Sequence, residues 1–354
     1  MPKKKTSTFS CGLLTTNQLA ERTRKYIRGS ADDIGWLQRD PYMPPVTDGT
    51  RRFMEILDSI RFGVHKLPNT LVYLLIPGLG SNHVPLYFVN TKTHLTNLGL
   101  TCYIAKIHSE ASVEKNARDV KQQIEEIYRT SQKRVMLLGH SKGGLDAAGA
   151  LSMYWFDLKD KVAGLALAQS PYGGTPLASD IARQGQLGDL FLRAIVFLVF
   201  NIIKGDVRAL EDLTYEKRRE FLRKHSLPKE IPVVSFHTEA EISSAAMATL
   251  THMANIDLCL TGRHEVIVPS GAAMAATACV VQTKYGEKSD GLVTRRDAEV
   301  PGSVVVRPSR KLDHQWLVFS SVKDSSYEAS SSQVCEALLQ LLLETGQSKN
   351  WNFA

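Results

Sequence analysis

From about residue 70 onward, short apolar runs alternate with segments of helical periodicity. Residues 71–76 form the first uninterrupted run, and Pro77 and Gly78 end it. Between Val113 and Tyr128, apolar residues recur at spacings of three and four, which places them on one helix face. An apolar run without polar interruption is typical of a strand buried on both sides. The alternation therefore predicts an α/β fold, with a mostly parallel central sheet and helices on both faces.

The same two patterns locate the remaining elements. We expect strands at residues 71–76, 101–107, 135–138, 162–168, 231–236 and 304–307, and helices at 51–60, 113–128, 142–153 and around 334–342. The alternation breaks between about residues 180 and 228, and so long an excursion between strands is usually a functional insertion. We divide the chain into an N-terminal extension (1–68), the first half of the core (69–180), a helical lid or cap insertion (181–230), the second half of the core (231–348) and a tail (349–354).

The overall composition is that of an ordinary globular protein. Of the 354 residues, 43% are hydrophobic and 22% are charged, which excludes collagen-like, wholly disordered and polytopic membrane chains. The longest apolar run, residues 190–203, would span roughly 21 Å as a helix, short of a hydrocarbon core of ~30 Å. We expect no membrane span.

Five widely scattered cysteines, none in a C-x-x-C pair, argue against a disulfide framework and against a structural zinc site. They suit a reducing compartment. The N-terminus contains no recognisable secretory signal, so the sequence predicts a cytoplasmic protein.

The net charge of +7 raises the question of a nucleic-acid surface. The main basic cluster, at residues 217–224, is interleaved with Glu216 and Glu220. This interleaving favours a solvated helix face over a nucleic-acid partner. Peripheral attraction to anionic lipid remains compatible with the charge.

Gly139, His140, Ser141, Lys142 and Gly143 match the pattern G-x-S-x-G. They lie directly after an expected strand and directly before an expected helix, the setting of a nucleophile elbow. The glycines allow a turn so tight that a Cβ would clash with neighbouring backbone. The alternative is a serine that only caps a helix after a glycine-rich turn.

A second glycine-rich loop, residues 77–81, follows the first expected strand. Acyl transfer requires backbone N–H donors aimed at the developing oxyanion. In a nucleophile-elbow enzyme one donor belongs to the residue after the serine and the other to an early loop. The corresponding amides here are those of Lys142 and Leu79.

The remaining catalytic partners are expected in the order serine, acid, histidine. His314 lies after the strand expected at 304–307 and before the last helix, a suitable place for a base. Asp290 is the preferred acid, and it precedes His314 by 24 residues. Glu239, just after the strand expected at 231–236, is the alternative.

Together these motifs resemble those of the α/β-hydrolases, and in particular of the bacterial true lipases and their lipase-like relatives. The resemblance covers residues 70 to about 320 and includes the segment 170–176, Ser-Pro-Tyr-Gly-Gly-Thr-Pro. It implies Ser141 as nucleophile, Asp290 as acid and His314 as base. It also implies an oxyanion hole formed by the amides of Leu79 and Lys142.

The chain departs from the lipase pattern at three positions. Pro77 stands where the lipases usually have His, and Lys142 where they have Gln. Both changes should affect which substrate is accepted rather than the backbone donors. Trp316 stands where the calcium-binding members carry Asp, so we expect no calcium site, and the reaction needs no metal or organic cofactor.

The apolar residues of 190–203 would cover nearly all faces of one helix, which is typical of a buried helix or of one that meets lipid. The position matches the family's cap, so Phe197 and Phe200 are candidates for the wall of an acyl-chain pocket. The alternative is a core helix.

The sequence thus predicts a serine carboxylic-ester hydrolase that cleaves lipid-like or other apolar esters. An acyltransferase with the same triad and a non-catalytic binding protein on the same fold are the alternatives. The sequence sets no expectation for the oligomeric state.

Overall fold

A computed structural model describes residues 29–84, 86–183, 207–242, 270–319 and 328–348. Their centre is a seven-stranded sheet of order β1-β7-β6-β5-β4-β2-β3, in which every neighbouring pair is parallel. The strands are β1 (Thr47–Asp48), β2 (Val72–Ile76), β3 (Thr101–Ile104), β4 (Val135–His140), β5 (Val162–Ala168), β6 (Val233–Phe236) and β7 (Val304–Val306). The predicted α/β fold with a parallel sheet is confirmed.

All six strands expected from apolar runs are present, with shorter limits at several ends. Every residue of β2, β4, β5 and β6 is buried. The two-residue strand β1, beyond β7 at the sheet edge, was not expected. It consists of Thr47 and Asp48, which are polar and exposed, so no apolar run marks it in the sequence. Only its pairing with β7 identifies it as a strand.

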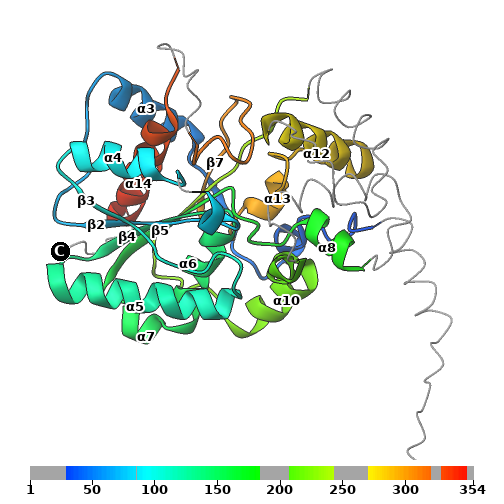
Figure 1. The fold of residues 1–354 in the computed structure, drawn as a ribbon, viewed down its shortest axis with the longest axis horizontal. Helices are drawn as coiled ribbons and strands as arrows, with labels where there is room; N and C mark the ends of the chain where they lie inside the picture. Colours follow the sequence, from blue (N-terminus) through cyan, green and yellow to red (C-terminus); the bar gives the residue numbers. More distant parts are fainter. Residues whose placement is uncertain (1–28, 85, 184–206, 243–269, 320–327, 349–354) are drawn as a thin grey trace, which may run out of the picture.

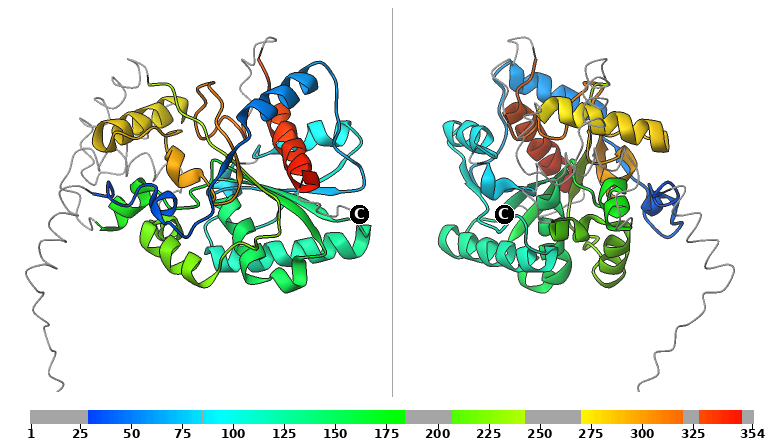
Figure 2. Two further views of the ribbon diagram at one scale, coloured as in Figure 1. Left: turned by 180° about the vertical axis from the view of Figure 1, so that it is seen from behind. Right: turned by 45° about the vertical axis from the view of Figure 1, so that its right-hand side comes forward.

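The sheet separates two hydrophobic layers (Figures 1 and 2). One face is covered by α5 (Val113–Ser131), α6 (Lys142–Met153) and α7 (Trp155–Leu158), and the other by α3 (Thr50–Arg61), α4 (Val89–Asn97) and α14 (Ser331–Ser348). The side chains of β2 alternate between the layers: Leu74 and Ile76 pack with the first, and Tyr73 and Leu75 with the second. This is the period-two pattern of a strand with apolar contacts on both faces.

The remaining elements gather on one side of the sheet, towards the right of Figure 1. They are α2 (Trp36–Arg39), α8 (Pro176–Arg183), the 3₁₀ helix η2 (Val207–Leu213), α10 (Tyr215–Lys224), α12 (Ser270–Tyr285) and α13 (Arg295–Ala298). A further short 3₁₀ helix, η1 (Ser81–His83), follows the loop after β2. No described helix is long and apolar enough to cross a membrane.

The described part of the predicted N-terminal extension packs against the rest of the protein. Phe53, Ile56 and Ile60 of α3 are buried in the same hydrophobic layer as α14. The Trp36 indole donates a hydrogen bond of 2.7 Å to the Gly173 carbonyl. Residues 29–61 therefore complete one sheet edge and, through α3, cover part of one face together with α4 and α14.

Candidate active site

Ser141 occupies the sharp turn between β4 and α6, with φ 55° and ψ −130°. This backbone conformation is sterically unfavourable for a residue with a side chain, so the surrounding structure must impose it. The adjacent glycines explain how the turn closes. A Cβ on Gly139 would lie 2.5 Å from the Gly144 Cα, and one on Gly143 would lie 2.3 Å from the Ile76 carbonyl oxygen. The sequence pattern is thus a steric requirement of this turn.

The structure brings Ser141, His314 and Asp290 into one chain of hydrogen bonds. His314 Nε2 lies 2.8 Å from Ser141 Oγ, and His314 Nδ1 lies 2.8 Å from Asp290 Oδ2. His314 and Asp290 are buried, and Ser141 is partly exposed. The second carboxylate oxygen of Asp290 accepts hydrogen bonds from the amides of Leu292 and Val293, at 3.0 and 2.9 Å. These two amides fix the carboxylate so that its other oxygen faces the imidazole.

Glu239, the alternative acid, makes different contacts. Its carboxylate forms ion pairs with Arg295, Lys288 and Lys311. Burial raises the pKa of Glu239, but the ion pairs with Lys311 and Lys288 outweigh it and leave this pKa below its ordinary value. The carboxylate is therefore held by cations at the sites where an imidazole would have to bind.

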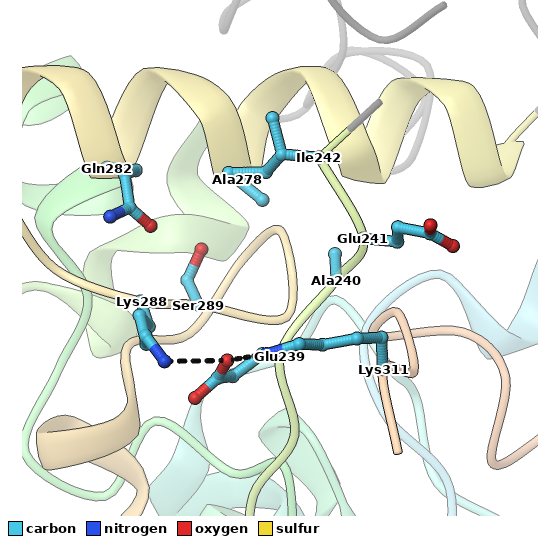
Figure 3. Close-up of a pocket in the computed structure, with 9 residues that line it drawn as sticks. All are labelled: Glu239, Ala240, Glu241, Ile242, Ala278, Gln282, Lys288, Ser289 and Lys311. Atoms are coloured by element: carbon cyan, nitrogen blue, oxygen red, sulfur yellow. Dashed lines mark hydrogen bonds and ion pairs between the residues drawn. The ribbon is translucent and has the colours of Figure 1, made fainter. Parts of the chain in front are cut away.

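Glu239 also borders a pocket, drawn in Figure 3 with the ion pairs to Lys288 and Lys311. Residues 239–242, α12 and Ser289 line it. Neither Ser141 nor His314 is among the lining residues, so this pocket is separate from the hydrogen-bonded chain that joins Ser141 to Asp290.

The loop after β2 lies against the serine. A Cβ on Gly78 would be 2.8 Å from the Ser141 Cβ, so only a glycine lets the loop approach this closely. Leu79 follows in this loop, and Lys142 is the first residue of α6. Neither backbone amide donates to a backbone carbonyl among the described residues. Lys142 directly follows Ser141, Leu79 follows the glycine that approaches Ser141, and the helix N-terminus adds a favourable dipole for negative charge.

The side chain of Lys142 points into the protein. It is 1% exposed, and its Nζ lies 2.9 and 3.2 Å from the two carboxylate oxygens of Asp146. Asn116 donates a further hydrogen bond of 2.9 Å to Asp146. Burial raises the pKa of Asp146 to about 6, although Lys142 and Asn116 act in the opposite direction. Its charge is paired inside the protein with a carboxylate four residues further along the same helix, and the effect of this lysine on substrate choice stays a prediction.

His140, which precedes the serine, was not identified as a site residue from the sequence. Its Nε2 lies 2.9 Å from the His314 carbonyl and 3.1 Å from Gln169 Oε1, both acceptors, so Nε2 carries the proton. Its Nδ1 then accepts from the Tyr87 hydroxyl at 2.6 Å. Burial holds the pKa of His140 well below its ordinary value. A neutral His140 thus positions the backbone of His314.

Two further expectations concern the insertion. Phe197 and Phe200 lie outside the described residues. In α10, Lys217 and Lys224 pair with Glu220 at the surface, as a solvated face requires. Arg218 contradicts that interpretation, because it is 1% exposed and its Nε donates to the Tyr172 carbonyl at 3.0 Å. The spacing of charged residues alone does not show which side of the helix faces the core.

No protein-family model matches the sequence, and no curated protein matches it. Solved structures do match. One is a metagenomic carboxyl esterase, MGS0156, at 19% identity and a TM-score of 0.60, covering 84% of this chain and 93% of the esterase. Another is the lipase BlEst2 of Bacillus licheniformis in its mature form, at 17% identity and a TM-score of 0.51, covering 71% of this chain and 87% of the lipase. At these identities the likeness is one of fold.

Proposed function

On the premise that the chain has the α/β-hydrolase fold, we propose that it is a serine carboxylic-ester hydrolase. The observation that carries the proposal is the hydrogen-bonded chain from Ser141 through His314 to Asp290. It combines a hydroxyl in a strained turn, an imidazole within reach of it and a carboxylate fixed by two backbone amides. This is the arrangement that activates a serine for attack on a carbonyl carbon.

In the proposed mechanism, Ser141 Oγ attacks the ester carbonyl while His314 Nε2 accepts the hydroxyl proton. Asp290 holds the Nδ1 proton and stabilises the imidazolium that forms. The tetrahedral oxyanion accepts hydrogen bonds from the amides of Leu79 and Lys142. His314 then donates its proton to the leaving alcohol, which leaves an acyl group on Ser141. Water, deprotonated by His314, attacks the acyl-enzyme and releases the carboxylic acid.

For the substrate, we propose lipid-like or other apolar esters. The fold neighbours, a lipase and a carboxyl esterase, support this class. Phe197 and Phe200 remain the proposed wall of an acyl-chain pocket. Each buried CH₂ contributes about 0.8 kcal/mol, so Phe→Ala at these positions should slow hydrolysis of long-chain p-nitrophenyl esters more than of the acetyl ester. An equal loss on all chain lengths would contradict the pocket.

We also keep the sequence-based assignment to a reducing, cytoplasmic compartment. The described cysteines Cys102 and Cys335 support it, since both are buried thiols. Expression as a fluorescent fusion, followed by fractionation, tests this assignment, and recovery in a secreted fraction would contradict it.

Labelling with a fluorophosphonate probe tests the proposed activity. We expect the probe to modify the wild-type protein at Ser141 and to leave Ser141→Ala unlabelled. Ser152→Ala is the matched control, because Ser152 lies on the same helix and its hydroxyl donates to the Ala148 carbonyl of the preceding turn. A wild-type protein that neither reacts with the probe nor cleaves esters would be a binding protein on this fold. Product analysis with an added alcohol separates hydrolysis from acyl transfer.

A further inference from the structure

Far from the serine in sequence, two histidines converge on one buried carboxylate. His65 follows α3, His94 lies in α4 and Glu336 lies in α14. His65 Nδ1 is 2.8 Å from Glu336 Oε1, and His94 Nε2 is 2.7 Å from Glu336 Oε2. The three potential ligand atoms all lie within 4.8 Å of one another. None of these residues takes part in the proposed hydrolysis.

The surroundings of the Glu336 carboxylate favour the binding of a cation. The Glu336 side chain is 0% exposed, and among the described residues it forms no ion pair with a lysine or an arginine. Among the described residues, its two oxygens contact the imidazole nitrogens of His65 and His94. A buried carboxylate without a compensating charge is costly, and buried charges in proteins are normally paired or coordinate metals. One bound dication would compensate the charge.

We propose that His65, His94 and Glu336 form a binding site for a divalent transition-metal ion, with Zn²⁺ as the ion that this ligand set fits best. Two imidazole nitrogens and one carboxylate are a common set of protein ligands for zinc. The imidazoles of His65 and His94 are 31% and 24% exposed, so water has access to a fourth coordination position. Ligands of a tetrahedral zinc lie roughly 3.3 Å apart, for bonds of about 2.0–2.1 Å. The nitrogens must therefore separate slightly from the oxygens they now contact.

The position of the site indicates what the ion would do. The ligands come from three segments of the layer that covers one face of the sheet (Figure 1). An ion bound to all three would hold α4 and the segment after α3 against α14. Because a ligand that binds the folded state selectively stabilises it, the ion should raise the melting temperature without being needed for hydrolysis.

The test uses the full-length protein, freed of metal with EDTA and then desalted. We expect calorimetric titration with Zn²⁺ to show saturable binding of one ion that His65→Gln and Glu336→Gln abolish. The melting temperature of the wild type should rise with Zn²⁺ by a few degrees, and that of the variants should not. Co²⁺ as a spectroscopic probe should give the visible absorption of a four-coordinate site in the wild type alone.

His108→Gln is the matched control, because His108 is an exposed histidine whose contact with Glu110, a carboxylate that His83 also approaches at 3.5 Å, is longer than the contacts at Glu336. It should keep both the Zn²⁺ binding and the rise in melting temperature. If Glu336→Gln does not fold, His65→Gln decides, since its side chain is partly exposed and contributes little to the core. A wild type that binds no stoichiometric Zn²⁺, or variants that bind it as the wild type does, would overturn the proposal and leave only a hydrogen-bonded contact.

Discussion

Two of the histidine–carboxylate clusters among the described residues have nearly the same contact distances and different third partners. At Asp290 and His314 the contact is 2.8 Å, and the far nitrogen of the imidazole meets the Ser141 hydroxyl. At Glu336 the contacts are 2.8 and 2.7 Å, but the third partner is a second imidazole on the other carboxylate oxygen. A hydroxyl beside the imidazole suits proton transfer, whereas a second imidazole beside the carboxylate suits coordination of a cation. The third residue beside a histidine–carboxylate pair therefore decides whether the pair suits proton transfer or cation binding.

The largest expected effect separates the two clusters directly. Ser141→Ala should lower kcat for ester hydrolysis by roughly 10⁴- to 10⁶-fold, because it removes the nucleophile of a unit whose members act together. Steady-state kinetics with a p-nitrophenyl ester measures this loss. Glu336→Gln should leave kcat unchanged. If it reduced kcat as strongly as Ser141→Ala, the clusters would not be independent.

The acid of the first cluster is tested by a pair of variants. Asp290→Asn should lower kcat by roughly 10⁴-fold, because an amide favours the wrong imidazole tautomer. Glu239→Gln should change kcat little, since Glu239 pairs with three cations instead. Parallel kinetics on the two proteins decides between them, and a more damaging Glu239→Gln would move the acid to the loop after β6.

Asp146 offers a reference for a buried carboxylate that has a cation from the protein itself. Lys142→Met should destabilise the fold by about 3–5 kcal/mol, because it leaves Asp146 buried without its partner. Urea unfolding measures the change. The double variant Lys142→Met/Asp146→Leu should recover much of this loss, and a single variant as stable as the wild type would mean that the ion pair contributes little.

His140 connects the two regions, because Phe88, at the start of α4, packs its ring against His140 at a centroid distance of 6.3 Å. Its pKa is depressed in the folded state, so only the unfolded chain takes up this proton as the pH falls. Stability should therefore be lost below about pH 6.5, at a rate of about 1.4 kcal/mol per pH unit from this group. Denaturant unfolding at pH 5 to 8 of the wild type and of His140→Gln should show a flatter profile for the variant. Parallel profiles would exclude His140 as the source.

The smallest effect on activity is expected from chelation. EDTA should leave ester hydrolysis unchanged, because no step of the proposed mechanism uses a metal. The melting temperature of Zn²⁺-loaded protein should fall in the same sample, because the cluster at Glu336 loses its ion. Activity that disappears in EDTA and returns with Ca²⁺ would contradict the expectation drawn from Trp316.

The first cluster was accessible from the sequence because the turn at Ser141 is a local motif, and because the expected order serine, acid, histidine and the resemblance to lipases pointed to Asp290 and His314, although His314 is 173 residues from Ser141. Strand, tight turn and helix follow one another around Ser141, and Asp290 lies only 24 residues before His314. His140, Gln169 and Tyr87 were missed, because nothing in their local sequence indicates that side chains after different strands meet. The Lys142–Asp146 pair carried a usable signal, opposite charges four residues apart on one helix, but not its burial.

The second cluster was not accessible in this way. His65 and His94 are separated from Glu336 by 271 and 242 residues, and no spacing rule joins them. The burial of Arg218 and the pairing of β1 with β7 likewise depend on contacts between segments that are distant in sequence. Hydrophobic period and steric turn requirements are properties of neighbouring residues, so the sequence alone determined the six strands β2 to β7, the helices α3, α5, α6 and α14, and the elbow at Ser141. Which distant side chains share a site depends on how α3, α4 and α14 pack on the sheet, and only the tertiary structure decided that.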